Sequence, residues 1–420
     1  MRIREFWTLD DEDRELIARL APGAGEDAAR VLAYLLLRSE ITDDPATELA
    51  LRIGTGLNRS AIGQAVDRLE SAGVVERTTV QSSTRGRPPS AWRTTAEIES
   101  VVQRLYRQHA ATLIERARPD TERGSETTAP TEDELTLGLN WRPNGLHLPF
   151  YTAGLTNQYE TFGLDVGIEH YDGSHPALEA VSSGAVDVGV VGAATVLRAR
   201  ADGEPIVPIA VVYQRAMAVL YTVRERFGEP LTGVAQLRGR RIGMPARSET
   251  RVLGRLFLNQ VALDEAVEII DTAGEEQDAL LSGDVDVVTG SFSDPRQLER
   301  QGMTVDTLIV ADHFPIYGPT LVVHEETLAS ETPRLERFLA GTIAGWAETC
   351  HDPTPAATHV AELSDSSPGR VARTFEDALG SFGTSEAVTE NGWGWQRETT
   401  WDRLRGALTQ GTLLSESETA

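Results

Sequence analysis

Lysine is absent from this 420-residue chain, and cysteine occurs once. Without a lysine amine no internal aldimine can form, so enzymes that hold pyridoxal phosphate in this way are excluded. The single cysteine, Cys350, excludes an internal disulfide and a cysteine-rich metal site, and it indicates a reducing compartment. Motifs of the types Gly-x-Ser-x-Gly, phosphate loop and His-Glu-x-x-His are also missing. We therefore expect no catalytic residues, no cofactor and no metal.

Long apolar runs are missing as well. No window of the sequence approaches the roughly 18 apolar residues that suggest a membrane-spanning helix. The N-terminal stretch MRIREFWTLDDEDREL has no apolar core of signal-peptide length and soon becomes acidic. We therefore expect a cytoplasmic protein that has no membrane partner.

Acidic residues are in large excess. The 64 Asp and Glu face 39 basic residues, all of them arginine, which gives a formal net charge of −25. Abundant carboxylate without lysine keeps a protein hydrated in concentrated salt, so we expect a halophilic, archaeal source. An acidic protein encoded by a GC-rich genome is the alternative.

The charge is unevenly spread along the chain. Residues 1–118 contain 17 Arg against 18 acidic residues, whereas residues 119–420 contain 22 Arg against 46. Within residues 47–96, seven Arg face four acidic residues, so this segment alone has a net charge of +3. A basic segment in so acidic a chain predicts a polyanionic partner for that segment.

The basic segment lies in a pattern of three helices followed by two strands. Asn58 is a candidate N-cap for the third helix, and the strands alternate in polarity on either side of the tip STRGRPP. This order resembles the winged helix-turn-helix domain of bacterial and archaeal regulators, over roughly residues 20–95. The expected elements are, in chain order, Glu26–Ser39, Pro45–Ile53, residues 59–73, residues 74–80 and residues 90–95.

The resemblance implies double-stranded DNA as a partner. The third helix carries hydroxyl, amide and guanidinium groups away from its apolar face, where they could reach base edges and phosphates. The tip between the strands offers two arginines on a stiff loop, which suits a narrow minor groove. Surface ion pairing of the arginines, or a protein-interaction module, is the alternative. The candidate DNA-binding residues are Arg59, Ser60, Gln64, Arg68, Arg85 and Arg87.

Residues 97–118 form one long helical pattern with an apolar stripe that includes Val101, Val102 and Leu105. The stripe could pair two subunits in the manner of a coiled coil, or it could pack back on its own chain. Since paired DNA half-sites usually call for a dimer, we predict a connecting and dimerisation helix and a homodimer, with His109 on the surface. Residues 119–133 are polar and acidic, which is typical of a solvated linker.

From residue 134 onward, strand and helix patterns alternate. This predicts an α/β fold with ligands at the C-terminal ends of its strands. Residues 178–194 (LEAVSSGAVDVGVVGAA) and 278–292 (DALLSGDVDVVTGSF) share an apolar helix, Ser-Gly, a Val-Asp-Val strand, and then Gly with a small residue. The repeat resembles the two-lobed periplasmic-binding-protein architecture, and ordinary loops of one domain are the alternative. We expect domains at residues 1–96, 97–118, 119–133 and 134–420, with the second lobe at roughly 240–315.

The stretch LNWRPNGLHLPFYTAG (139–154) places rings at the exit of a strand. Its pattern Trp141-x-Pro-Asn144-x-x-His147, with Tyr151 four residues on, resembles the binding proteins for thiamine pyrimidine precursors and the related fungal pyrimidine synthase, over about residues 134–410. The resemblance implies that Trp141 and Tyr151 stack on an aminopyrimidine ring, while Asn144 and His147 shape the cleft rim. Asn140 replaces the usual acidic residue and Pro149 the usual glycine, and either change could alter ligand preference.

The remaining walls follow from the same resemblance. Ser248–Thr250 would cap a polar or phosphate substituent, because a helix N-terminus with hydroxyl groups suits an anion. Glycines and small polar residues at strand ends would let a ligand meet the backbone. The candidate ligand-binding residues are Trp141, Asn144, His147, Tyr151, Ser174, Gly192, Ser248, Glu249, Thr250, Gly290, Ser291 and Tyr317.

These features together predict a one-component transcriptional regulator of the cytoplasm. It would bind DNA through the winged helix and sense a small effector, an aminopyrimidine-like heterocycle, between the lobes. A divergent pyrimidine-synthase-like enzyme with a regulatory head is the alternative, although the missing lysine and cysteines oppose it. Nitrate-, sulfonate- and flavin-precursor-binding proteins share the expected fold, so the sequence leaves the effector open.

Overall fold

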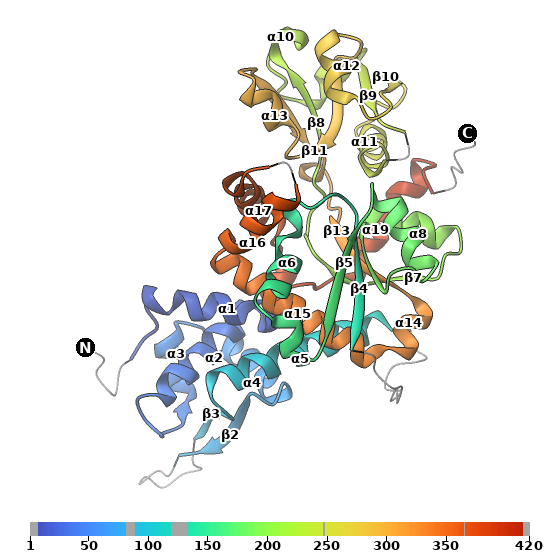
Figure 1. The fold of residues 1–420 in the computed structure, drawn as a ribbon. Coiled ribbons are helices and arrows are strands. Elements are labelled where there is room, and N and C mark those ends of the chain that lie inside the picture. The colour runs from blue at the N-terminus through green and yellow to red at the C-terminus, as the bar shows by residue number, and fades with distance from the viewer. Residues whose placement is uncertain (1–6, 81–88, 119–132, 247, 365, 415–420) are drawn as a thin grey trace.

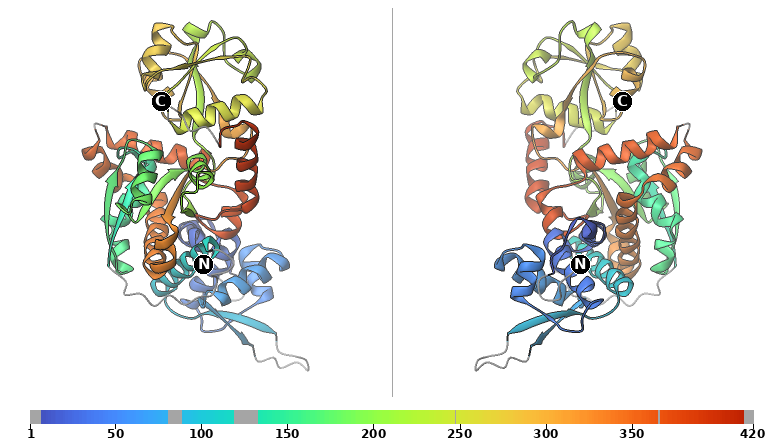
Figure 2. Two further views of the ribbon diagram at one scale, coloured as in Figure 1. Left: turned by 90° about the vertical axis from the view of Figure 1, so that its right-hand side faces the viewer. Right: turned by 90° about the vertical axis from the view of Figure 1, so that its left-hand side faces the viewer.

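The computed structural model describes residues 7–80, 89–118, 133–246, 248–364 and 366–414. Arg85 and Arg87 of the predicted wing tip lie outside these ranges, as does nearly all of the predicted linker. The molecule has three parts in a row: an N-terminal unit at one end, lobe one in the middle and lobe two at the other end (Figures 1 and 2). The N-terminal unit comprises residues 7–118.

The N-terminal unit has helices around a small antiparallel sheet of order β1-β3-β2. The hairpin of β2 and β3 points away from the rest of the molecule (Figure 1). Its elements are η1 (Asp11–Asp13), α1 (Arg14–Ala24), α2 (Glu26–Ser39), β1 (Ala46–Thr47), α3 (Glu48–Thr55), α4 (Arg59–Ser71), β2 (Val75–Thr79), β3 (Ser90–Thr94) and α5 (Ile98–Ala117).

Local signals in this unit place several elements correctly. The predicted helix Glu26–Ser39 is confirmed as α2, and Asn58 caps α4 by accepting a hydrogen bond from the Ala61 N–H at 3.0 Å. The predicted helix Pro45–Ile53 is wrong at its start. Ala46 pairs with Trp92 of β3, and the Thr47 side chain caps α3, so the helix begins only at Glu48.

The α5 helix does not present its apolar stripe to a second subunit. Its buried residues pack against α1, α15 (Thr332–His351) and β7 (Ile206–Val211) of the same chain. One continuous apolar core therefore runs from the N-terminal unit into lobe one. The prediction of a dimerisation helix is corrected in this respect, because the stripe is already covered. His109 is also buried rather than on the surface, and its Nε2 lies 2.7 Å from the Trp393 carbonyl.

Lobe one is a five-stranded sheet of order β5-β4-β6-β13-β7, in which only β13 runs antiparallel to its neighbours. Its elements, besides β7 and α15, are β4 (Glu134–Leu139), η2 (Gly145–His147), α6 (Leu148–Leu155), α7 (Gln158–Thr161), β5 (Asp165–His170), α8 (Ser174–Ser182), β6 (Val188–Gly192), α9 (Ala193–Ala201), β13 (Pro319–His324) and α14 (Glu325–Ser330). Four further helices follow: α16 (Thr354–Leu363), α17 (Pro368–Phe382), α18 (Glu386–Asn391) and α19 (Glu398–Gln410).

Lobe two repeats the same strand order as β10-β9-β11-β8-β12, with β8 antiparallel to β11 and β12. It begins at β8, well before the predicted boundary near residue 240. The reason is that β8 is the strand by which the chain enters the lobe. The elements are β8 (Ala218–Val223), α10 (Arg224–Phe227), η3 (Val234–Leu237), β9 (Arg241–Met244), α11 (Glu249–Gln260), β10 (Glu268–Asp271), α12 (Glu276–Ser282), β11 (Val287–Ser291), α13 (Pro295–Arg300), β12 (Val305–Ile309) and η4 (Val310–Asp312).

The repeated Val-Asp-Val pattern has a structural cause. In each lobe the aspartate stands just before the central strand of the sheet, β6 or β11, and accepts a hydrogen bond from the neighbouring strand, β4 or β9. Asp187 accepts from the Thr136 N–H and Asp286 from the Arg241 N–H, both at 2.8 Å. Each aspartate also forms a salt bridge with an arginine, Asp187 with Arg334 and Asp286 with Arg241. The sequence repeat therefore marks equivalent positions in the two sheets, as predicted.

Candidate functional site

A large cleft of about 1870 Å³ lies between the lobes. Its walls come from the C-terminal ends of β4, β6 and β11, from the N-terminal turns of α8 and α11, and from α17. Eleven of the twelve residues proposed from the sequence line it: Trp141, Asn144, His147, Ser174, Gly192, Ser248, Glu249, Thr250, Gly290, Ser291 and Tyr317.

Tyr151 is the exception, and its predicted stacking role is not supported by its position. The side chain is buried, and its ring lies 5.8 Å from that of His359 in α16, which is outside the cleft lining. Successive residues of a helix point about 100° apart, so α6 can direct only one of two adjacent rings into the cleft. That ring is Phe150.

The strand-exit motif builds one side of the cleft. Trp141 follows the end of β4 and is 53% exposed, so much of its ring is open to a ligand. Asn144 uses both ends of its amide locally, because its oxygen caps η2 at Leu146 and its nitrogen donates to the Arg142 carbonyl. Gly145 has no room for a side chain, since a Cβ would lie 2.3 Å from the Val371 carbonyl oxygen of α17. The motif thus presents Trp141 and holds the turn against α17.

His147 forms part of the cleft floor. Its Nε2 lies 3.4 Å from the Asn140 oxygen, and the Asn140 nitrogen lies 3.4 Å from the Ser174 hydroxyl, which also accepts the Gly192 N–H. Burial is the larger cause, and the nearby His170 the smaller one, that lowers the pKa of His147 to about 3, so the ring is neutral. Within the described residues the Nδ1 atom has no hydrogen-bond partner. A neutral ring that donates through Nε2 leaves Nδ1 as an acceptor.

Glu249 reaches from lobe two to lobe one. It opens α11, whose first turn is fixed by the Ser248 hydroxyl accepting the Arg251 N–H. The carboxylate accepts the Ala194 N–H at 3.1 Å, the Thr195 N–H at 3.2 Å and the Thr195 hydroxyl, all at the start of α9. Burial raises the pKa of Glu249, and these hydrogen bonds act in the opposite direction.

The lobe-two wall carries a second carboxyl group. Asp294 accepts the Ser291 N–H at 2.7 Å, and a Cβ on Gly290 would lie 2.6 Å from the same oxygen. Burial is the main cause that raises the pKa of Asp294 to about 6, and the Glu276 carboxylate adds to it. The neighbouring Thr289 hydroxyl is buried and has no partner among the described residues.

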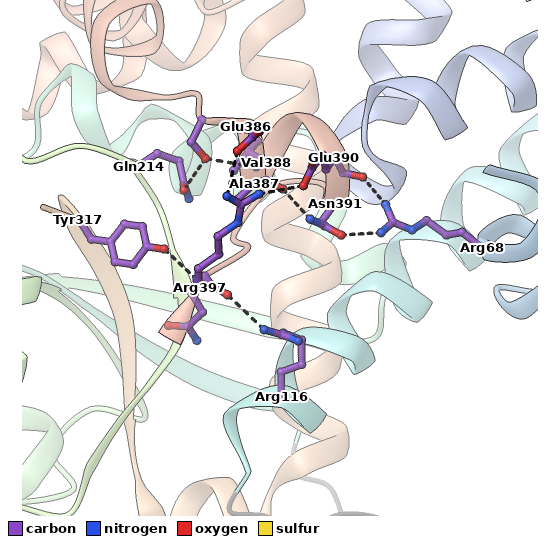
Figure 3. Close-up of polar contacts among 12 residues, drawn as sticks. Arg68, Arg116, Gln214, Tyr317, Glu386, Ala387, Val388, Glu390, Asn391 and Arg397 are labelled. Atoms are coloured by element: carbon purple, nitrogen blue, oxygen red, sulfur yellow. Dashed lines mark hydrogen bonds and ion pairs between the residues drawn. The ribbon is translucent and has the colours of Figure 1, made fainter. Parts of the chain in front are cut away.

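Tyr317 connects the cleft to a stretch near the C-terminus, residues 385–397, which we call the connecting segment. The Tyr317 hydroxyl accepts the Arg397 N–H at 2.8 Å. Gln214 accepts from the Ser385 hydroxyl at 2.8 Å and donates to the Trp395 carbonyl at 3.1 Å. Tyr317 and Gln214 lie on the two chain crossings between the lobes, residues 212–217 and 310–318, so the connecting segment rests on the hinge (Figure 3).

The same segment contacts the N-terminal unit. Arg68 of α4 donates to the Glu390 carbonyl at 2.5 Å, to the Asn391 side chain at 2.6 Å and to the Ala24 carbonyl at 2.7 Å. Arg116 of α5 donates to the Gln396 carbonyl (Figure 3). Arg68 was predicted to face DNA, but the structure places its guanidinium inside this contact. The other candidates on α4, Arg59, Ser60 and Gln64, are exposed.

Several cleft residues escaped sequence reasoning. Tyr213 and Tyr221 sit in apolar strands or crossings where a ring predicts only core, and the chain positions of Asp294 and Arg370 give no sign of the cleft. The nearest sequence signal was Gly290, which lies four residues before Asp294. None of the described helices is long and apolar enough to cross a bilayer. The described residues also contain no cluster of metal-binding side chains.

Two lobes of matching topology around a deep cleft define a periplasmic-binding-protein-like fold. The aliphatic sulfonate-binding protein SsuA of Escherichia coli has this fold in common with the chain, with a TM-score of 0.54, 15% identity, and coverage of 68% of this chain and 95% of SsuA. Residues 144–356 match the family described as NMT1/THI5 like, and the chain belongs to that family.

Two relatives are named as binding proteins. The riboflavin-binding protein RibY of Chloroflexus aurantiacus is 27% identical over 300 residues, which cover 68% of this chain and 83% of RibY. The formylaminopyrimidine-binding protein of Halalkalibacterium halodurans is 22% identical over 314 residues, which cover 70% of this chain and 92% of that protein. The similarity therefore extends over the greater part of this chain and of each relative.

The raised pKa of Asp294 gives a pH-dependent prediction. A carboxyl group whose folded-state pKa is above its unfolded value destabilises the fold at high pH, and this cost disappears as the pH falls from about 6 towards about 4. Asp294→Asn should therefore be more stable than the wild type at pH 7.5, and the difference should shrink by pH 4.5. Urea unfolding at both pH values measures it, with Asp278→Asn as the matched control. A difference that does not change with pH would contradict the assignment.

Proposed function

We propose that this protein is a ligand-responsive transcriptional regulator of the cytoplasm. The N-terminal unit acts as a winged helix-turn-helix that binds double-stranded DNA. The interlobe cleft binds a flat heterocycle of the thiamine-pyrimidine-precursor class or a related ring. The observation that carries the proposal is the connecting segment, which touches both the hinge of the cleft and the α4 helix. The acidic, lysine-free composition of the whole chain suits a protein that stays dissolved in concentrated salt.

The geometry of the N-terminal unit supports the DNA-binding part. The order α2, α3, α4 and then a β2–β3 hairpin matches the order expected of a winged helix, in which α4 would serve as the recognition helix. Arg59, Ser60 and Gln64 are exposed along α4, and a Cβ added at Gly63 would meet no atom within 4 Å, so this face is open. Arg59 pairs with Glu48 at 3.1 Å, and its guanidinium would exchange this carboxylate for a DNA phosphate.

The cleft supports the ligand part. The exposed Trp141 ring offers a stacking surface. The unpartnered His147 Nδ1 atom is buried, so it would accept from an amino or N–H group of a ligand only after the ring turns towards the cleft. An aminopyrimidine carries such groups along the edge of its ring. The two relatives are named for binding riboflavin and formylaminopyrimidine, which are both flat nitrogen heterocycles. Stacking plus a few directed polar groups is the usual chemistry of such sites.

Communication between the two sites would run through the connecting segment. Closure of the lobes rotates the two crossings on which Gln214 and Tyr317 lie, and both hold the segment by hydrogen bonds. The other side of the segment holds Arg68, so α4 follows its movement. Regulators of this kind commonly bind paired half-sites. Because α5 is packed within its own chain, a second copy would pair through another surface.

The DNA interface is tested by the double variant Arg59→Ala/Gln64→Ala. Each base or phosphate contact contributes about 1–3 kcal/mol, so we expect operator affinity to fall about 30-fold or more. Gel shift or fluorescence anisotropy with the gene's own upstream DNA, at fixed salt, measures the loss. Arg14→Ala/Gln108→Ala removes the same residue types from exposed positions outside α4 and should change little. Equal affinities for the two double variants would refute the assignment of α4.

The ligand site is tested by Trp141→Ala. Loss of a stacking ring should weaken binding of riboflavin or an aminopyrimidine about tenfold or more, while DNA binding without ligand stays unchanged. Isothermal titration calorimetry gives the dissociation constants, and Leu363→Ala, an exposed apolar side chain on α16, is the control. Wild-type ligand affinity in Trp141→Ala would show that the ring is not part of the site.

The coupling is tested by Asn391→Ala, which removes an Arg68 partner without altering the cleft or the open face of α4. Effectors typically change a coupled affinity about 5–150-fold. We expect the ratio of the DNA affinity with ligand to the DNA affinity without ligand to come at least threefold closer to one in the variant, a change of about 0.7 kcal/mol. The ligand affinity measured without DNA should be retained. Asn259→Ala on α11 is the control. An unchanged ratio would exclude this route of communication.

A further inference from the structure

The start of α9 adjoins the cleft residue Gly192 and has the form of an anion position, which the protein fills with its own side chain. This helix has nine residues, and the backbone N–H groups of its first turn are among the orphan donors that attract phosphate or sulfonate. Here the Ala194 and Thr195 N–H groups and the Thr195 hydroxyl all donate to Glu249. A ligand anion at this point would find these three donors occupied and would face a carboxylate.

The sequence is adapted to this contact from both sides. Gly192, at the end of β6, leaves the space that the carboxyl group occupies, because a Cβ there would lie 2.4 Å from the Glu249 Cδ atom. Ser248 caps α11 and so fixes the residue that carries the carboxyl group. The backbone of Gly192 has φ −65° and ψ 142°, which any residue can adopt, so its lack of a side chain serves space rather than conformation.

The rest of the cleft also disfavours anions. Asp294 adds a second carboxyl group on the lobe-two wall, and Arg296, which lies nearby, is already paired with Asp377 of α17. The other lining arginines, Arg300, Arg370 and Arg373, are exposed, but the carboxylates of the lining outnumber its arginines by eight to four. The floor instead presents the His147 ring, which is neutral and suits an uncharged ligand.

We infer that Glu249 is a specificity-determining residue that makes the cleft select uncharged or amine-bearing heterocycles over their phosphorylated or sulfonated forms. This inference rests on the proposed ligand class, and it corrects the expectation that the Ser248–Thr250 turn receives a phosphate substituent. By joining α11 to α9, the same carboxylate holds the lobes together next to the bound ligand.

The test compares matched pairs of ligands on three proteins. Calorimetry at constant ionic strength measures riboflavin against its 5′-phosphate, and a pyrimidine alcohol against its phosphate ester, on the wild type, Glu249→Gln and Glu249→Ala. The wild type should prefer the uncharged member at least about 100-fold, and the variants should narrow the preference at least tenfold. Glu275→Gln removes an exposed carboxylate at the cleft mouth and should leave the preference unchanged. Equal affinity of the wild type for both members, or an unchanged preference in both Glu249 variants, would overturn the inference.

A separate arm does not depend on the identity of the ligand. Phosphate and methanesulfonate should raise the melting temperature of Glu249→Ala by several degrees more than that of the wild type or Glu275→Gln. If no heterocycle binds the wild type but this difference is seen, the proposed ligand class fails while the role of Glu249 stands. If the anions act equally on all three proteins, the role of Glu249 fails whatever the ligand.

Discussion

The arrangement of this molecule depends on the guanidinium group of Arg68. It brings a positive charge into the contact between the N-terminal unit and the connecting segment, where burial lowers its pKa. Three oxygens from two distant parts of the chain compensate it, those of Ala24, Glu390 and Asn391. A buried charge costs free energy unless it is hydrogen-bonded, so this contact contributes orientation more than net stability. It fixes α4 relative to a segment that belongs to the binding domain.

That segment derives its position from the hinge. The two crossings between the lobes are hydrogen-bonded to each other, through the Ala216 N–H to the Ile316 carbonyl and the Gly318 N–H to the Tyr213 carbonyl. Gln214 and Tyr317 extend this pair to the connecting segment. Glu249 joins the lobes directly, next to Gly192, which pairs with Pro319 at the end of the second crossing. A ligand that competes with or supports the Glu249 contact would therefore bias the hinge and, through it, the orientation of α4.

The sequence predicted what is local and missed what is distant. The Asn58 cap, the α2 helix and the paired Val-Asp-Val strands each depend on residues close in sequence, or on a repeat that can be compared with itself. The roles of Arg68 and Tyr151 depend on α18 and α16, which lie hundreds of residues away and carry no motif. For α5, apolar spacing shows that one face is buried but not whether a second chain or the same chain covers it. The cleft residues were found mainly because β-strand ends converge there.

The charge pattern of the chain explains why the cleft depends on carboxylates. Its only permanent cations are arginines, whose planar fork suits paired contacts with carboxylates and carbonyls. Within the described ranges, many of them link segments distant in sequence: Arg334 holds Asp187, Arg224 holds Asp306, and Arg296 holds Asp377. One of the four arginines that line the cleft, Arg296, is engaged in this way, and the carboxylates of the lining outnumber its arginines by eight to four. A chain whose arginines hold its own segments together and whose surface carries an excess of acid is therefore suited to an uncharged ligand. Glu249 adds a carboxylate in the binding site itself.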